Sequence, residues 1–230
     1  MILQMNKIEK SFGSSFVLKD FSLKVNKEEI LCIVGPSGCG KSTMLNIISG
    51  YLVPSRGEIV NKSKNISYVF QEDRLLPWKN VYENIHIVNK IASKDKIKAL
   101  IEKVELIGFE NHYPSELSGG MRQRCSIARA FNYEADLLLM DEPFKSLDYN
   151  LRFHMIEQLI KLWEMKQNSI IFVTHEIDEA LLLGDRIVVL SNRPTRIMKE
   201  FQIKISRRKR NLKDKILMNI RNEIVDYLVR

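Results

Sequence analysis

The stretch "GPSGCGKST" (Gly35–Thr43) directly follows the apolar run "EILCIV" (Glu29–Val34). Glycine loses more backbone freedom on ordering than any other residue, so three glycines beside a proline and a lysine need a physical reason. The spacing G-x-x-x-x-G-K-[ST] between an expected strand and an expected helix supplies one. Glycines let consecutive backbone N–H groups turn inward around an anion, and the start of the next helix adds its partial positive charge. The stretch therefore predicts a phosphate-binding loop.

Within this loop the polar residues have distinct expected roles. Lys41 supplies a full positive charge for the β- and γ-phosphates of a nucleotide, and the Ser42 hydroxyl is a hard oxygen ligand for Mg²⁺. Kinases, GTPases and motor ATPases share such a loop, so it predicts a nucleotide but not the reaction. We expect the nucleotide to contact all nine residues, Gly35, Pro36, Ser37, Gly38, Cys39, Gly40, Lys41, Ser42 and Thr43.

Short apolar runs recur along the chain and alternate with helical patterns. Several are apolar on consecutive residues, which is typical of strands covered on both faces. Strands that alternate with helices predict an α/β fold with a mostly parallel sheet and right-handed crossovers. Residues 1–10 and 16–25 alternate apolar with polar side chains and predict an antiparallel β edge. The runs are "EILCIV", "NISYVF" (65–70), "DLLLMD" (136–141), "SIIFVT" (169–174) and "DRIVVL" (185–190).

The stretch 72–125 holds helical patterns without a convincing strand, so we expect it to be an inserted α-helical subdomain. The predicted α/β core then comprises residues 1–71 and 126–200. Residues 201–230 are expected to form a basic, helical C-terminal tail, because apolar residues recur four apart in its second half.

Composition favours a soluble, intracellular protein. Apolar residues make up 45% and charged residues 28% of the 230 positions, which is ordinary for a globular chain. The longest apolar runs cover four or five residues, whereas a membrane-spanning helix needs roughly 20. No signal peptide is expected at the N-terminus. Cys32, Cys39 and Cys125 are odd in number and widely spaced, so we expect free thiols rather than disulfides or a zinc site, with Cys39 reacting first with alkylating agents.

The net charge of +8 is unevenly distributed. The last 31 residues hold nine Lys and Arg against four Asp and Glu, and include the cluster "RRKR" (Arg207–Arg210). Such a cluster is compatible with a solvated face, with contact to anionic lipid, or with contact to nucleic acid.

Two adjacent carboxylates follow the apolar run in "LLLMDEP" (Leu137–Pro143). Asp141, at the predicted strand end, is placed to hold the shell of a Mg²⁺ ion, usually through water. Glu142 can polarise the attacking water as a general base.

A second candidate anion site lies in "LSGGMRQR" (Leu117–Arg124), where a serine and two glycines begin an expected helix. It falls in the helical insertion, far along the chain from Lys41. Two phosphate cradles for one ligand suggest that the second one caps a nucleotide held by a twin subunit, although a plain helix cap would also explain it.

Together with the glycine loop, "LSGG" resembles the signature motif of the ATP-binding cassette (ABC) ATPases, and the resemblance covers the chain to about residue 200. It implies a RecA-like P-loop NTPase core with ATP and Mg²⁺ as cofactors. In that family the residue corresponding to Gln71 contacts Mg²⁺ and the water, and the one corresponding to His175 reaches the γ-phosphate. Phe12 matches the aromatic that stacks on adenine. The implied catalytic residues are thus Glu142, His175 and Gln71, and the implied metal ligands are Ser42, Gln71 and Asp141.

The same resemblance implies a head-to-tail homodimer with two ATP molecules between the subunits. Ser118, Gly119 and Gly120 would each contact the ATP bound by the partner. The segment Ser146–Asp148 matches the family's D-loop, and Asp148 would lie at the nucleotide interface.

A transporter ATPase without a spanning segment must dock on separate membrane subunits. The family makes this contact beside the glutamine, here "QEDRLLPW" (Gln71–Trp78), although its apolar side chains could instead pack the helical subdomain. The sequence looks most like ATPases of nitrate/sulfonate/taurine-type importers, a group that includes carriers of thiamine-precursor pyrimidines. This implies a solute-binding protein, a place on the cytoplasmic face of the membrane and no nucleic-acid partner. Lys145 and Ser146 depart from the small residues usual in that group.

Three other classes of function differ from this one in features of the sequence. An ABC exporter or lipoprotein-release ATPase differs mainly in the docking groove and stays open. A soluble ABC protein of DNA repair or chromosome structure would show zinc cysteines or a long coiled-coil insertion, and an ABC translation factor would carry two cassettes. This sequence shows none of these features. A small-molecule kinase has no need of "LSGGM".

Overall fold

The structure is a computed structural model that describes residues 1–229, and it contains two β-sheets. The smaller sheet is antiparallel, with the order β2-β1-β4. The larger has the order β5-β6-β7-β3-β8-β9, and all neighbouring strands are parallel except β8 and β9. The strands are β1 (Leu3–Phe12), β2 (Ser15–Val25), β3 (Ile30–Val34), β4 (Arg56–Asn61), β5 (Ile66–Val69), β6 (Leu137–Asp141), β7 (Ser169–Thr174), β8 (Arg186–Leu190) and β9 (Ile197–Gln202).

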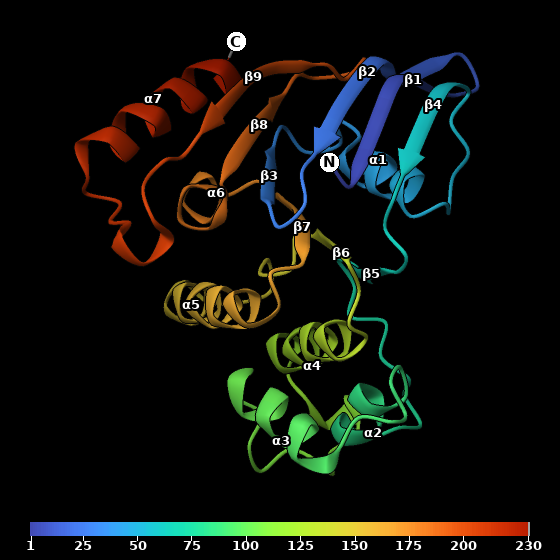
Figure 1. Cartoon of the computed structure of the whole chain (residues 1–230), viewed down its shortest axis with the longest axis vertical. Helices are drawn as coiled ribbons and strands as arrows, with labels where there is room; N and C mark the ends of the chain where they lie inside the picture. The colour runs from blue at the N-terminus through green and yellow to red at the C-terminus, as the bar shows by residue number, and fades with distance from the viewer. Residues whose placement is uncertain (230) are drawn as a thin grey trace.

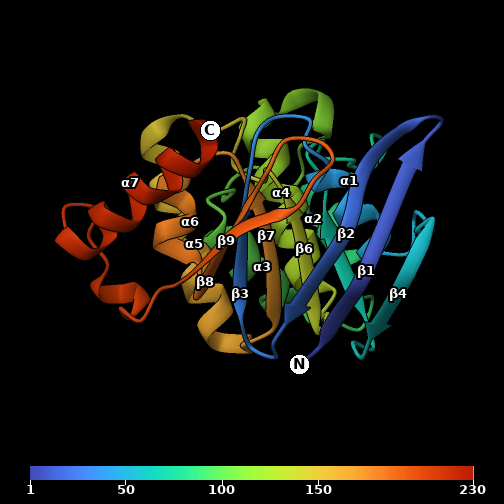
Figure 2. The ribbon, with the colours of Figure 1, turned by 90° about the horizontal axis from the view of Figure 1, so that it is seen from above.

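Helices cover both faces of the larger sheet. Helix α1 (Lys41–Ile48) lies between the two sheets, whereas α5 (Tyr149–Lys166), α6 (Ile177–Leu183) and α7 (Lys215–Val229) cover the opposite face (Figure 2). The helices α2 (Val81–His86), α3 (Lys94–Lys103) and α4 (Gly119–Asn132) gather at one end of the molecule (Figure 1). Short 3₁₀ turns occur at Pro114–Glu116 and Arg207–Lys209.

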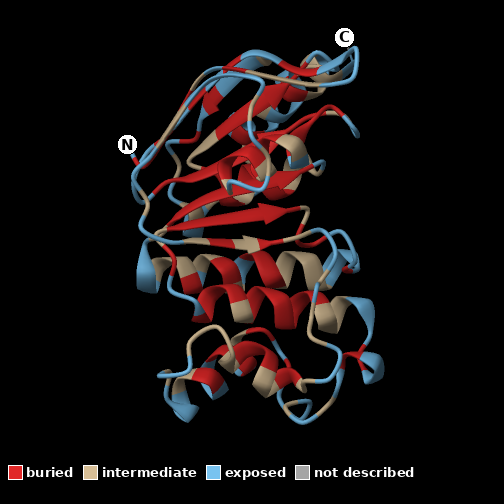
Figure 3. Ribbon diagram, turned by 90° about the vertical axis from the view of Figure 1, so that its right-hand side faces the viewer, coloured by how far each residue is buried: buried red, intermediate tan, exposed pale blue. Residues whose placement is uncertain are grey.

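The central strands are buried on both faces, which is why they are apolar on consecutive residues. In β3 the side chains of Leu31 and Ile33 join the core around α1, whereas Cys32 and Val34 join the core around α5 and α6. Figure 3 shows these strands as a buried layer with half-exposed helices beneath them. The alternation of strands with helices therefore builds two cores on one sheet.

These features confirm the predicted α/β class with a mostly parallel sheet, but two strands were not anticipated. The expected antiparallel edge is a separate sheet that includes β4, whose sequence "RGEIVN" is too polar and too exposed to signal a strand. Strand β9 extends to Gln202 and pairs with β8, so the first residues of the expected helical tail are extended. Helix α4 runs through the proposed boundary at residue 125, and the division into domains stays a prediction.

The basic cluster Arg207–Arg210 is only partly a solvated face, because Arg207 and Arg210 are half-buried whereas Arg208 and Lys209 are exposed. Arg210 Nη1 donates to the carbonyl oxygens of Leu181, Leu182 and Gly184 at 2.8–3.0 Å. Arg207 Nε donates to the Leu183 carbonyl, and its guanidinium stacks 4.0 Å from the Trp163 ring centroid. The last carbonyls of a helix lack partners within the helix, so these arginines cap α6.

Arg208 completes the attachment of the tail, because its Nε donates to Glu164 of α5 at 2.8 Å. Lys209, by contrast, is exposed. In residues 1–229 no helix combines the length and the apolar character required to cross a bilayer.

Candidate nucleotide site

Three groups of predicted site residues leave the larger sheet at a single edge. In the parallel register, Val34 of β3 pairs with Thr174 of β7, and Asp141 of β6 pairs with Val173. The glycine loop after Val34, Glu142 after Asp141 and His175 after Thr174 therefore start side by side. The carboxyl edge of a parallel sheet is where open α/β folds bind ligands.

The glycine loop has a backbone that only glycine can follow without strain. Gly38 and Gly40 have φ angles of +72° and +124°. A Cβ atom on Gly40 would lie 2.7 Å from Val17 Cγ1 and 3.1 Å from Thr195 Oγ1. A Cβ on Gly35 would lie 2.9 Å from the Leu190 side chain. The loop is thus fixed by its neighbours, and α1 begins directly after it at Lys41.

Lys41 is buried within the loop that it follows. The residue is only 6% exposed. Its Nζ atom donates to the carbonyl oxygens of Gly35 and Pro36, both at 2.8 Å. These bonds hold the ammonium group at the mouth of the glycine loop, where a phosphate would meet it. The positive charge is therefore placed before any ligand arrives.

Ser42 and Asp141 form a pair of hard oxygen donors. Burial raises the pKa of the Asp141 carboxyl, and a hydrogen bond from the Ser42 side chain opposes that rise. A hydroxyl and a carboxylate in contact are ligands that suit Mg²⁺. The third expected ligand, Gln71, follows β5 and is exposed, and its side chain makes no hydrogen bond to residues 1–229. Ser42 and Asp141 therefore fit a Mg²⁺ ion, whereas the Gln71 side chain makes no hydrogen bond to either of them in this structure.

Glu142 lies at the centre of a group of charged residues. Its backbone is in the left-handed region, with φ of +47°, and its N–H donates to the Val173 carbonyl at 2.9 Å. The Oε2 atom is buried and accepts no hydrogen bond of good geometry within the described chain. Lys145 Nζ lies 3.1 Å from this oxygen and His175 Nδ1 lies 3.4 Å from it. A buried carboxylate oxygen that accepts no well-aligned hydrogen bond is suited to accept a proton from water.

Behind His175, an ion-pair network joins α5 to α6. His175 Nε2 lies 3.5 Å from Glu176 Oε1, and Arg152 Nη1 lies 2.7 Å from the same oxygen. Arg152 Nε also approaches Glu179 Oε1 at 3.5 Å. Arg152 stands one turn into α5, whose N-cap is Asp148. The network thus links the expected partner-facing segment to the histidine.

Ser118, Gly119 and Gly120 lie away from the glycine loop in this chain. Ser118 is the N-cap of α4, and its Oγ accepts from Met121 N at 3.2 Å. The nearest atoms that a Cβ on either glycine would meet belong to Arg122, Ser146 and Leu147, with Leu147 only 2.9 Å from Gly120. The motif therefore caps a helix in this chain, with Ser118 and Gly119 exposed and Gly120 half-buried.

Phe12 and the segment Gln71–Trp78 are both at the surface. Phe12, at the end of β1, is 52% exposed, with Lys10 Nζ 5.3 Å from its ring centroid. In the second segment Trp78 is 69% exposed, whereas Leu75 packs against the core. Packing of the helical region therefore accounts for Leu75, and docking of membrane subunits at this stretch stays a prediction.

Two features of the site escaped the sequence analysis. Thr195, which is fully buried after β8, donates its hydroxyl to the Cys39 carbonyl and its N–H to the Val17 carbonyl, so it supports the glycine loop from behind. No local signal marks Thr195, because its partners are far along the chain. Cys39 was expected to be reactive, but it is 2% exposed and burial raises the pKa of its thiol. Fast alkylation of Cys39 is therefore not expected in the folded chain, although Cys39 is the most exposed of the three thiols.

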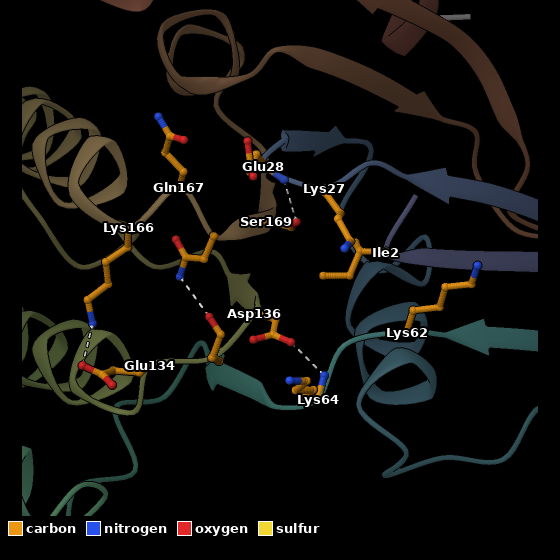
Figure 4. A pocket seen from close by; sticks show the side chains of 12 residues that line it. Ile2, Lys27, Glu28, Lys62, Lys64, Glu134, Asp136, Lys166, Gln167 and Ser169 are labelled. Carbon is orange, nitrogen blue, oxygen red and sulfur yellow. Dashed lines mark hydrogen bonds and ion pairs between the residues drawn. The ribbon is translucent and has the colours of Figure 1, made fainter. Parts of the chain in front are cut away.

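A separate hollow of about 500 Å³ lies at the opposite edge, where β3, β5, β6 and β7 begin (Figure 4). Its polar groups largely pair with one another. Lys166 faces Glu134, the Lys64 N–H donates to Asp136, and the Glu28 N–H donates to Ser169 (Figure 4). None of the predicted site residues lines this hollow, so the candidate nucleotide site is at the carboxyl edge of the sheet.

Comparison with known proteins is consistent with this geometry. A family model described as "ABC transporter" matches residues 18–145. An "Aliphatic sulfonates import ATP-binding protein SsuB" from Bacillus cereus is 42% identical over 89% of this chain and 87% of its own length. An SsuB 2 protein from Burkholderia cenocepacia is 36% identical over all of this chain and 88% of its own length.

Solved structures give the same picture of the fold. A dimeric, post-hydrolysis state of the ATP-binding cassette MJ0796 bound to ADP and Pi superposes with a TM-score of 0.77, at 29% sequence identity, over 89% of this chain and 100% of that chain. A second dimeric structure of MJ0796, described as a bacterial ABC transporter cassette, has a TM-score of 0.79 at the same identity and coverage.

Proposed function

This chain belongs to the ABC transporter family and is an ATPase of it, and we propose that it powers the import of a small sulfonate through separate membrane subunits. One observation carries the proposal. The glycine loop with Lys41, the Ser42–Asp141 pair and the buried Glu142 oxygen all start from one edge of the sheet. The substrate class rests on the relatives named for aliphatic sulfonate import.

ATP would be held by the nine residues of the glycine loop. Backbone N–H groups and the start of α1 would receive the phosphates, and Lys41 would exchange its loop carbonyls for the β- and γ-phosphate oxygens. Phe12 would stack on the adenine, a contact worth roughly 1 kcal/mol. Ser42, Asp141 and Gln71 would hold Mg²⁺, which when bound supplies positive charge against the phosphates.

Hydrolysis would use Glu142 as the general base. Its buried oxygen would accept a proton from the attacking water, and general-base catalysis contributes typically 10²–10⁴-fold. His175 would leave its acidic neighbours to donate to the γ-phosphate. Gln71 would orient the same water after ATP binding brings Gln71 toward the glycine loop.

A second copy of this chain would complete the site. Ser118 and Gly119 are exposed and Gly120 is half-buried, and a Cβ on either glycine would meet atoms of Arg122, Ser146 or Leu147 rather than of the glycine loop, so the segment could cover the ATP of a partner. Asp148, exposed at the start of α5, would lie in the same interface. The dimeric state described for MJ0796 supports this arrangement. ATP would then close the pair, because it binds the closed dimer better than the open one.

The membrane subunits would dock beside Gln71–Trp78, where exposed Trp78 and half-buried Leu76 offer an apolar surface. The protein would work on the cytoplasmic face of the membrane, together with a separate solute-binding protein and without nucleic acid. The import names of the relatives favour this direction over export or lipoprotein release.

The proposal can be tested by growth and uptake. A strain that lacks this chain but keeps its membrane subunits should not grow on an alkanesulfonate as the only sulfur source, and should grow normally on sulfate. The wild-type chain should restore growth and uptake of labelled alkanesulfonate, whereas Lys41→Ala should not. Growth without the chain would reject the substrate class, and rescue by Lys41→Ala would reject the role of ATP.

A further inference from the structure

Lys145 stands out in the site because it is a cation placed against the proposed base. Its Nζ lies 3.1 Å from Glu142 Oε2, three residues earlier in the chain. The Lys145 side chain is 52% exposed, whereas that of Glu142 is 11% exposed. The ammonium therefore reaches inward from solvent to a carboxylate that the fold has already fixed through its left-handed backbone.

The contact concerns the oxygen that the reaction needs. Oε2 of Glu142 accepts no well-aligned hydrogen bond in the described chain, yet Lys145 and His175 both approach it within 3.4 Å. An ammonium group at this distance attracts the carboxylate and holds its oxygen in one orientation. A carboxylate held in this orientation is not free to turn toward an attacking water.

Lys145 is also joined to the segment expected to face the partner. It precedes Ser146 and Leu147, and both of these lie close to Gly120, with the Ser146 carbonyl 3.7 Å and Leu147 Cδ2 2.9 Å from the Cβ position. A movement of this segment against the start of α4 would carry the Lys145 backbone with it. The ion pair can therefore respond to closure of the dimer.

We propose that Lys145 is a positioning residue that holds the Glu142 carboxylate in a resting arrangement and releases it when the two cassettes close. The inference rests on the proposed role of Glu142. It identifies Lys145 as a restraint on turnover rather than as a contributor to ATP binding.

Steady-state ATPase measurements on Lys145→Gln test this proposal. We expect kcat to rise about two- to fivefold with the KM for ATP unchanged, because an ion pair with a half-exposed member is weak but acts on the reacting group. Lys145→Arg keeps the charge and should behave as the wild type. Lys161→Gln, which removes an exposed lysine from α5, is the matched control and should also leave both constants unchanged.

A measurement without nucleotide tests the contact itself. The urea midpoints of Lys145→Gln, Glu142→Gln and the double variant should be non-additive, because the second substitution removes a pair that is already broken. Additive midpoints would overturn the proposed contact. A kcat for Lys145→Gln that is unchanged or lowered would overturn the restraint.

The variant Glu142→Gln distinguishes the general-base role of Glu142 from the restraint by Lys145. If Glu142→Gln abolishes turnover while Lys145→Gln behaves as the wild type, the base assignment stands and only the restraint fails. If Glu142→Gln hydrolyses ATP normally, the proposed function of Glu142 fails, and the inference fails with it.

Discussion

The Thr174 hydroxyl donates a 2.6 Å hydrogen bond to Oε2 of Glu179, and this bond ties the end of β7 to α6 directly beside His175. Glu179 is only 3% exposed. Burial raises the pKa of its carboxyl to about 7, although the Thr174 hydroxyl and Arg152 both act to lower it. The loop that carries His175 is thus supported by a carboxyl group that titrates near neutral pH.

This pKa predicts a pH dependence of stability. Between about pH 4.5 and 7 the folded chain keeps a proton on Glu179 that the unfolded chain releases. The contribution of Glu179 to the free energy of unfolding is therefore complete below pH 4.5 and is lost as the pH rises to 7. The loss is on the order of 3 kcal/mol. Glu179→Gln keeps an acceptor for Thr174 and should remove this component. Urea unfolding of both chains at pH 5 and pH 7.5 checks it, and an identical pH dependence would contradict the assignment.

Glu142→Gln should leave ATP binding intact and reduce turnover about 10²- to 10⁴-fold, because the amide cannot accept the proton of the attacking water. Without hydrolysis the ATP-bound dimer should persist, which light scattering would detect. Glu157→Gln removes an exposed carboxylate of α5 and serves as the matched control. Turnover close to that of the wild type would refute the base assignment.

Ser118→Arg should spare ATP binding by the single chain and prevent the ATP-dependent dimer, because a bulky cation would fill the proposed partner-facing cradle. The substitution also removes the N-cap bond to Met121, at a cost of about 1 kcal/mol. Ser118→Ala loses the same bond without adding bulk, so it separates the two effects. Dimers of Ser118→Arg with ATP would assign another role to this motif.

The three thiols should be protected in the folded chain. Cys32, Cys39 and Cys125 are all buried, and burial raises the pKa of each thiol. Because the thiolate is the reactive form, a thiol-specific reagent should modify none of them quickly in buffer and all three in urea. Rapid modification of one equivalent, mapped to Cys39, would show that the glycine loop opens in solution.

Several parts of the fold and site were predictable because their signals are local. The glycine loop, "LLLMDE" and the start of α4 each combine a strand end or helix start with the residues that act there, within about ten positions. Consecutive apolar residues marked the central strands, since both faces of the sheet are covered. The roles assigned to the individual site residues remain predictions.

Other parts depended on contacts that no local pattern records. Strand β4 is recognisable only through its pairing with β1, and β9 only through its pairing with β8. The basic cluster Arg207–Arg210 reads as surface charge, yet it caps the end of α6, about 25 positions earlier. Two members of a charge run can become half-buried when helix carbonyls without partners lie opposite them.

The sequence by itself thus determined the class of ligand, because glycines, a lysine and a serine at fixed spacing after an apolar run are typical of a phosphate-binding loop. Only the tertiary structure decided how the groups stand toward one another: Thr195 behind the glycine loop, Lys145 against Glu142, and the exposed serine cap of α4 apart from the loop of its own chain. The reason is physical, since conformational preference acts over a few residues, whereas distances between charges are fixed by packing across the whole sheet.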